Sequence, residues 1–341
     1  MKAAVYYNNH DIRIEEYPVP EISDDELLVK VESCGICGSD VMEWYRIKKA
    51  PLVLGHEIAG TIFEVGRNVE KFAAGQEVFV SHHVPCNTCR YCLAGMHSLC
   101  DTLRTTNFDP GGFSQFIRVP RINVDRGTFV LPSSISFDEG TFVEPLACVL
   151  RGLRMAQFKP ASSVLVLGSG ISGLLHVKAL RALGASRIVS TDIEPFRLDA
   201  AKRFGADEVL EAGEATKETL AAANGGRLYD LVILCAGVKS VAEQAFNLVD
   251  RGGTLLFFAP LAPGVDVSMP FFKVWRDQIR IVSTYAGCPV DIEEAIDLLG
   301  SRRIEVNDMI THRLPIAETQ RGFSLVAEGK ESIKVIIKPH E

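Results

Sequence analysis

A glycine-rich turn between an apolar strand and a helix is the feature that most restricts how this chain can fold. The apolar run SVLVL at 163–167 leads into G-S-G-I-S-G at 168–173, and a helical stretch follows. A G-x-G-x-x-G sequence in this position is typical of a turn that binds a dinucleotide pyrophosphate at a helix N-terminus. Gly168 would permit the tight turn, Gly170 the approach of backbone to phosphate, and Gly173 the packing of helix on strand. A strand–helix turn that binds nothing is the alternative.

An acidic residue after the next strand predicts which dinucleotide is bound. Asp192 ends that strand, 19 residues after Gly173. A carboxylate there accepts hydrogen bonds from a ribose 2′-hydroxyl and repels a 2′-phosphate, which favours NAD over NADP. Arg197 lies close by and either reaches the adenosine or is an ordinary cation on a helix surface. Four further residues are assigned to the cofactor site: Ile171, Ser172, Ala259 and Thr284.

The pattern of the chain changes after Pro160, where short apolar strands begin to alternate with helical stretches. Strands are predicted at 164–167, 188–191, 231–235, 254–258 and 279–283, and helices near 172–183, 195–204, 215–223, 239–249 and 269–277. Strands that are buried on both faces and joined by helices form a parallel, doubly wound sheet. We therefore predict an α/β protein with a dinucleotide-binding domain at 151–286.

Residues 1–150 are predicted to form a second, β-rich domain, since a chain of 341 residues at about 150 residues per domain has room for two. Alternating or β-branched runs indicate a barrel-like or sandwich-like body, with strands at 2–7, 27–33, 58–65, 77–81 and 115–119. The remaining segment, 287–341, contains predicted helices at 291–299 and 317–328 and a last strand at 332–337. It is too short to stand alone, so we expect it to pack back onto the first domain.

Composition excludes several classes of protein. The chain is 47% hydrophobic and 23% charged, as ordinary globular proteins are, and its net charge of −7 argues against nucleic acid as a main partner. The most apolar stretch, 252–272, holds three prolines and an aspartate, so no membrane span is expected. The N-terminus lacks the apolar core of a secretory signal. We therefore expect a cytoplasmic protein whose nine cysteines stay reduced and are buried or bind metal.

Four cysteines form a C-x2-C-x2-C-x7-C pattern in an irregular lobe at 85–101: Cys86, Cys89, Cys92 and Cys100. Four thiolates this close can surround one ion, and a tetrahedral thiolate shell is what structural zinc prefers. An iron–sulfur cluster is the alternative metal group, and four unrelated thiols are the alternative without metal. A closed shell leaves no open position, so this zinc should hold the lobe together and take no part in chemistry. His97 lies in the same lobe and is expected to be exposed.

A second metal site would be open. Cys37 lies in CGICGSD, His56 and Glu57 lie in LGHE, and Glu144 lies in VEPL. Three protein ligands plus a water or substrate form the pattern of a catalytic zinc. Which of the two glutamates is the third ligand is open. Other metal-binding side chains are set aside: Cys34 is interpreted as core, and His82 and His83 have no thiol to pair with.

In this order, the motifs resemble the zinc-containing medium-chain dehydrogenase/reductase family, and most of all its sorbitol (polyol) and threonine dehydrogenase branch. They are GICGSD at 35–40, GHE at 55–57, the cysteine lobe, EPL at 144–146, VLGSGISG at 166–173 with Asp192, and THRLP at 311–315. The resemblance covers essentially the whole chain. It implies a GroES-like catalytic domain divided around a Rossmann domain, and two zinc ions per chain. The implied reaction is reversible oxidation of a secondary alcohol to a ketone with NAD.

The resemblance also implies roles for single residues and a mode of assembly. Zinc would be held by Cys37, His56 and Glu57, with Glu144 binding directly or through the metal's water. Ser39 would bind the substrate oxygen and begin a proton relay. The expected partners are a small alcohol or ketone and further copies of the chain. A tetramer is favoured over a dimer, with pairing through the last strand of the Rossmann sheet.

Three positions depart from the pattern of this branch. Met42 stands where a histidine often passes the proton to solvent, and Glu43 stands where polyol enzymes have a tyrosine. Thr284 stands where they have an arginine before a tyrosine. The substrate is therefore left open among polyols, cyclic alcohols, hydroxy-acid derivatives and amino alcohols. Candidate pocket residues, each with a structural role as the alternative, are Glu43, Trp44, Tyr45, Phe108 and Tyr285.

Other functions would use only some of these motifs. A zinc-free alkene reductase on the same scaffold would lack the GHE and four-cysteine motifs. A non-catalytic, NAD-binding zinc protein would lack a working open site. A nucleic-acid-binding zinc lobe would be basic, whereas the stretch 81–104 contains only Arg90 and Arg104 as fixed cations.

Overall fold

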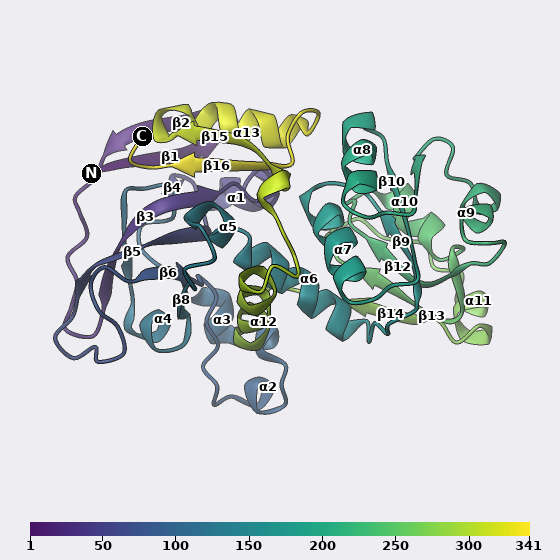
Figure 1. Ribbon diagram of the computed structural model, residues 1–341, viewed down its shortest axis with the longest axis horizontal. Helices are drawn as coiled ribbons and strands as arrows, with labels where there is room; N and C mark the ends of the chain where they lie inside the picture. The colour runs from purple at the N-terminus through teal and green to yellow at the C-terminus, as the bar shows by residue number, and fades with distance from the viewer. The chain divides into compact units, whose positions relative to one another are not determined.

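The computed structural model describes residues 1–341 and divides into two compact units (Figure 1). The first unit comprises Met1–Ala147 and Ala286–Glu341, and the second comprises Cys148–Tyr285. One unit is rich in antiparallel strands and the other is built on a parallel sheet. The predicted α/β fold class is confirmed.

Two sheets form the first unit. The smaller sheet has the strand order β2-β1-β4, and the larger has the order β15-β16-β3-β5-β6-β8 with β7 paired to β3. The strands are β1 Lys2–Asn8, β2 Asp11–Glu16, β3 Leu27–Gly35, β4 Leu52–Val53, β5 Glu57–Val65, β6 Glu77–Val80, β7 Phe116–Val119, β8 Thr128–Val130, β15 Ile310–Pro315 and β16 Lys334–Lys338. β16 pairs with β3, with Ile336 opposite Gly35, so the last strand of the chain joins the sheet of the first unit. Sequence reasoning missed β2, because its many charged residues form a partly exposed strand that pairs only with β1.

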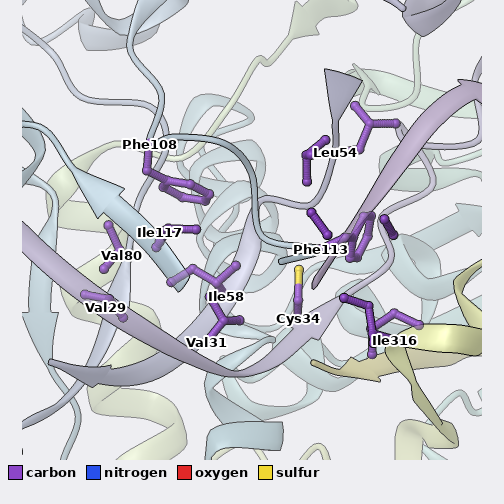
Figure 2. Packing of buried hydrophobic residues seen from close by; sticks show 14 of the residues in the cluster. Val29, Val31, Cys34, Leu54, Ile58, Val80, Phe108, Phe113, Ile117 and Ile316 are labelled. Carbon is purple, nitrogen blue, oxygen red and sulfur yellow. The ribbon is translucent and has the colours of Figure 1, made fainter. Parts of the chain in front are cut away.

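The core of the first unit lies against β3 and β5 (Figure 2). Val29 and Val31 lie on one face of β3, because alternate residues of a strand point the same way, and both are fully buried. Burying each such side chain stabilises the fold by about 1.5–3 kcal/mol. Cys34 is fully buried in the same cluster, where Figure 2 shows it among apolar side chains. Its thiol therefore belongs to the core.

Short helices and turns connect these strands. They are α1 Glu43–Arg46, α2 Arg90–Leu93, α3 Asp101–Thr105, α4 Arg121–Arg126 and α5 Phe137–Gly140, with α12 Pro289–Gly300 and α13 Thr319–Glu328 in the last part of the chain. Four 3-10 turns lie at Ile47–Lys49, His97–Leu99, Asn307–Met309 and Ile316–Glu318. The longer helix α6, Val143–Met155, was not predicted from the sequence. Pro145 fits this helix because it lies in the first turn, where a missing N–H costs no helical hydrogen bond.

A six-stranded parallel sheet with the order β11-β10-β9-β12-β13-β14 forms the second unit. Its strands are β9 Ser163–Leu167, β10 Arg187–Asp192, β11 Glu208–Glu211, β12 Tyr229–Leu234, β13 Val249–Phe257 and β14 Arg280–Ser283. The helices between them are α7 Ile171–Ala182, α8 Pro195–Arg203, α9 Lys217–Ala223, α10 Lys239–Ala245 and α11 Phe271–Arg276. In chain order the strands read 3-2-1-4-5-6, so the direction of winding reverses between β9 and β12, where doubly wound sheets bind their ligands. None of the helices in the structure is both long and apolar enough to cross a bilayer.

Candidate active site and metal centres

The candidate ligands of the open metal site come from the paired ends of two strands. Cys37 lies two residues beyond the end of β3, and His56 immediately precedes β5. Gly35 and Glu57 are opposite each other in the β3–β5 ladder. The ligand atoms of Cys37, His56 and Glu57 therefore converge and all lie within 4.8 Å of one another. Glu144 lies in the first turn of α6, outside this set of atoms.

Asp40 orients two of these ligands. Its carboxylate accepts a hydrogen bond from the backbone N–H of Cys37 at 3.0 Å, and its other oxygen lies 3.4 Å from Nδ1 of His56. The side chain of Asp40 is fully buried. With Nδ1 facing Asp40, Nε2 is the ring nitrogen left for a metal, the usual arrangement for a histidine ligand. Sequence reasoning missed Asp40, although an acid three residues after the cysteine was a usable signal.

The protonation of these ligands in the metal-free chain fits a metal site. Burial raises the pKa of the Cys37 thiol, and the neighbouring Glu57 raises it further. Burial acts to lower the pKa of His56, but Asp40 and Cys37 outweigh it and hold that pKa well above its usual value. Because zinc binds thiolate and neutral imidazole, binding would displace these protons. Sulfur, nitrogen and oxygen donors on three residues match the donor set that zinc accepts.

Glu57 has a partner that the sequence did not reveal. The ammonium of Lys334, in β16, donates a hydrogen bond to Oε2 of Glu57, and both side chains are almost fully buried. A Cβ at Gly35 would lie 2.4 Å from the same oxygen, so only glycine leaves room for the pair. The Lys334 ammonium also lies 4.9 Å from the ring centre of Phe142. Glu57 is thus fixed as a buried carboxylate beside His56.

Ser39 lies beside the ligand cluster and is held by an arginine. Arg46 Nη2 donates a hydrogen bond to Ser39 Oγ at 2.9 Å, and Arg46 Nε donates one to the Ser39 carbonyl oxygen at 3.0 Å. A Cβ placed on Gly38 would meet nothing within 4 Å, so there is open space beside this glycine. Glu43, Trp44, Tyr45 and Tyr285 are exposed, whereas Phe108 is 2% exposed in the core.

Two histidines that sequence reasoning had set aside lie next to His56. The ring centres of His56 and His82 are 4.7 Å apart, and those of His82 and His83 are 3.7 Å apart. Burial lowers the pKa of His83 to about 3 and holds that of His82 well below its usual value. Neither belongs to the set of converging ligand atoms. Both rings therefore border the site as neutral groups.

The four cysteines of the lobe converge as a second cluster, with all their sulfur atoms within 4.8 Å of one another. Sγ of Cys86 accepts backbone hydrogen bonds from Thr88 at 3.4 Å and from Cys89 at 3.2 Å. A hydrogen bond from the Thr88 hydroxyl, with these two, lowers the pKa of the Cys86 thiol to about 5. Four sulfurs, one of them stabilised as a thiolate, fit a structural zinc. His97 is outside this cluster and, contrary to expectation, partly buried.

The glycine turn after β9 has room where a pyrophosphate would bind. Gly168 has φ +99°, which favours glycine, and a Cβ on Gly173 would lie 1.9 Å from the carbonyl oxygen of Gly168. A Cβ on Gly170 would meet nothing within 4 Å, so the N-terminus of α7, with Ile171 and Ser172 in its first turn, faces open space. This cradle fits the phosphate groups of a dinucleotide.

Asp192 is fixed next to this turn. Its Oδ2 accepts a hydrogen bond from the backbone N–H of Ser169 at 2.7 Å, and its Oδ1 accepts one from Glu194 at 3.0 Å. Nη1 of Arg197 lies 3.9 Å from Oδ2 of Asp192, so this arginine points towards the acid and not only into solvent. Of the other predicted cofactor contacts, Ala259 follows β13 and Thr284 follows β14, and the Thr284 hydroxyl is buried without a hydrogen-bond partner.

Known proteins match this chain over its whole length. The family model for the alcohol dehydrogenase GroES-like domain matches residues 23–126, and that for zinc-binding dehydrogenase matches residues 172–301. Sorbitol dehydrogenase of Bacillus subtilis (strain 168) is 32% identical over 352 residues, which cover 100% of this chain and 98% of that protein.

Solved structures agree with these matches. Galactitol-1-phosphate dehydrogenase from Escherichia coli superposes with a TM-score of 0.88 at 29% identity and covers 99% of this chain and 100% of that one. A zinc-binding dehydrogenase from Sinorhizobium meliloti 1021, solved bound to NADP, superposes with a TM-score of 0.88 at 29% identity and covers 99% of each chain. The chain is thus an enzyme that belongs to the zinc-containing medium-chain dehydrogenase/reductase family, in its sorbitol dehydrogenase-like branch.

Proposed function

We propose that this enzyme reversibly oxidises a secondary hydroxyl group of a polyol to a ketone, with NAD as hydride acceptor and zinc at Cys37, His56 and Glu57. The observation that carries the proposal is the convergence of these three ligand atoms within 4.8 Å. A serine hydroxyl and open space at Gly38 lie beside them. The polyol class is supported by relatives that act on sorbitol and on galactitol 1-phosphate.

The chain's own residues prepare the site for this reaction. Zinc, when bound, supplies a Lewis acid that polarises an alcohol oxygen. Asp40 fixes the ring of His56, and Lys334 holds one oxygen of Glu57, which leaves the other oxygen for a metal. We assign to Ser39 the role of accepting the hydroxyl proton of the substrate. We assign to Glu144 a place beside the metal site, outside the three converging ligands. Met42 has no group that can accept a proton, so the proton leaves Ser39 by another route.

The sequence departs from the pattern of the polyol branch at several positions, so we propose the substrate class and not sorbitol itself. Met42, Glu43 and Thr284 replace a histidine, a tyrosine and an arginine of the branch. Trp44 and Tyr45 are 40% and 39% exposed and remain candidates to contact substrate. Phe108 is part of the core and is no longer a candidate.

NAD is the proposed cofactor because of Asp192. A carboxylate at the end of β10 would accept hydrogen bonds from a ribose 2′-hydroxyl and repel a 2′-phosphate. The cofactor site would consist of the turn residues Gly168, Gly170, Ile171, Ser172 and Gly173, together with Asp192, Arg197, Ala259 and Thr284. One solved relative is bound to NADP, so the test below compares both cofactors.

We further propose that the protein is a cytoplasmic homotetramer. β14 lies at the edge of the six-stranded sheet, and Ile281 on it is 42% exposed. On α11, Phe271, Phe272 and Trp275 are 65–67% exposed. A second copy of the chain would cover this apolar surface and extend the sheet. The two predicted thiolate sites require reduced cysteines, which supports a reducing compartment.

The proposed activity is tested by a screen of polyols with the zinc-loaded enzyme. Sorbitol, xylitol, D-arabinitol and galactitol 1-phosphate are each incubated with NAD or NADP, and NADH or NADPH formation is followed by absorbance. We expect turnover of at least one polyol with NAD and a weaker reaction with NADP. No turnover with any secondary alcohol would contradict the proposal.

A further inference from the structure

The group that contacts the hydroxyl of Ser39 is the guanidinium of Arg46. It makes two bonds to this one residue, from Nη2 to Oγ at 2.9 Å and from Nε to the carbonyl oxygen at 3.0 Å. Arg46 is itself held, because Nη2 lies 3.3 Å from Oδ1 of the fully buried Asp40 and Cζ lies 4.7 Å from the ring centre of Tyr45. Its side chain is only 15% exposed. Both the backbone and the hydroxyl oxygen of Ser39 are therefore fixed.

An arginine that bonds a hydroxyl group determines which hydrogen bonds that hydroxyl can still make. Its guanidinium donates hydrogen bonds, has no acceptor, and stays charged at every working pH. Ser39 Oγ has one hydrogen and two lone pairs, and Arg46 occupies one lone pair. The second lone pair is left for a hydroxyl group of the substrate, and the Ser39 hydrogen must point to a third group. Arg46 cannot be that group.

We propose that Arg46 is a positioning residue for the reaction assigned above, which aims the free lone pair of Ser39 Oγ at the substrate hydroxyl. The inference rests on the proposed function. Ser39 Oγ would accept the proton of the substrate hydroxyl and release its own hydrogen to water, and a bound NAD would supply the hydride acceptor that balances the oxidation. Arg46 places a fixed positive charge beside Ser39. Met42, at the position where the branch often has a histidine, supplies no group that accepts the proton.

A second route from Arg46 to the site has to be separated from this one. Asp40 connects Arg46 to His56, at 3.4 Å from Nδ1, and to the backbone N–H of Cys37. Loss of Arg46 could therefore act on the metal ligands and not on Ser39. The two routes differ in what they change, because the first depends on the Ser39 hydroxyl and the second changes how firmly zinc is held.

The test is a double-mutant cycle on the full-length, zinc-loaded enzyme with NAD and the best polyol of the screen. We expect Arg46→Met to lower kcat by about 10- to 100-fold, because misplacing a reacting group by about 1 Å can cost that much. In a Ser39→Ala background the same change should lower kcat by less than about twofold, because the group it positions is gone. Arg46→Lys should restore part of the loss, since lysine keeps the charge but not the two-bond fork. Lys48→Met removes an exposed charge from the same segment and should leave kcat unchanged.

Two measurements besides activity accompany the cycle. Zinc retained after dialysis against a chelator should be equal in wild type and Arg46→Met, and the calorimetric Kd for the polyol should change by less than about threefold. An equal loss of kcat in the Ser39→Ala background, or faster loss of zinc from Arg46→Met, would overturn the inference. Arg46 would then act through Asp40 on the metal ligands. If the wild type oxidises no alcohol, the proposed function fails first and this inference fails with it.

Discussion

Lys334 donates a hydrogen bond from its ammonium to Oε2 of Glu57, and the two side chains are 1% and 2% exposed. The residues are 277 positions apart in the chain, and the pairing of β16 with β3 and of β3 with β5 brings them together. The carboxylate of this pair belongs to the residue that follows His56. The pair therefore connects the last strand of the chain to the candidate metal site.

The first prediction concerns this pair. Lys334→Met leaves the Glu57 carboxylate buried without its cation, so we expect the free energy of unfolding to fall by about 3–5 kcal/mol. Added zinc should recover part of the loss, because a bound cation stabilises only the folded state. Urea unfolding with and without zinc measures both effects. As a control, Lys71→Met breaks the exposed pair with Asp125 and should cost less than about 1 kcal/mol. An equal fall in the free energy of unfolding for the two variants would show that the buried pair stabilises the fold no more than an exposed one.

The second prediction concerns the cysteine lobe. Elemental analysis of the wild type should give about two zinc ions per chain, one for each ligand cluster. Cys92→Ser should reduce this to about one, and the lobe should become sensitive to protease because it has few apolar residues of its own. Cys34→Ala removes a thiol that is buried in the core and should keep both ions. Iron in place of zinc, or two ions retained by Cys92→Ser, would contradict the assignment.

The third prediction is a pH dependence of stability that arises in the second unit. Burial lowers the pKa of His176, on α7, to about 4. The usual pKa near 6.5 applies to the unfolded chain, so below about pH 6.5 the unfolded state binds a proton that the folded state does not. His176 should therefore cost the fold nothing at neutral pH and about 3 kcal/mol by pH 4.

A matched variant isolates this effect. His176→Asn keeps a donor for the Ser172 carbonyl, which Nδ1 contacts at 2.7 Å, and removes the titrating ring. The variant should be less stable than wild type near neutral pH because of the smaller side chain. The difference should shrink as the pH falls, and urea unfolding at several pH values measures it. A constant difference across this range would show that His176 does not titrate as stated.

The fourth prediction concerns cofactor choice. Asp192→Gly should weaken NAD binding and reduce discrimination against NADP, because the acceptor for the ribose 2′-hydroxyl and the repulsion of a 2′-phosphate are lost. Kd values for both cofactors can be measured by the quenching of intrinsic fluorescence. Asp199→Asn removes an exposed acid on the neighbouring helix and should change neither Kd. An unchanged preference for NAD over NADP in Asp192→Gly would show that another residue selects the cofactor.

Much of the fold could be predicted because its signals are local. The apolar strands of the second unit and the turn at Gly168 are each contiguous in sequence. The residue type at each of these positions can be explained from its sequence neighbours alone. The spacing from Cys86 to Cys100 works in the same way, since a short loop is enough to bring four sulfurs together. Helix α6 was not among the predicted helices, although Pro145 lies in its first turn and does not interrupt it.

The parts that could not be predicted depend on contacts between distant segments. Lys334 reads as an ordinary strand lysine, and only the strand order shows that it meets Glu57. His82 and His83 could not be placed beside His56, because nothing in the sequence fixes how the segment after β6 turns. Arg46 was overlooked because no spacing rule connects it with Ser39, although the two are only seven positions apart.

The central claim is that a zinc ion held by Cys37, His56 and Glu57 makes this chain an alcohol dehydrogenase. The most direct measurement is zinc content together with polyol-dependent NADH formation for Cys37→Ser and the wild type. The account predicts that Cys37→Ser retains about one zinc ion per chain, in the four-cysteine lobe, binds NAD normally, and forms no NADH. Full alcohol oxidation by a Cys37→Ser enzyme that has lost this zinc would contradict it.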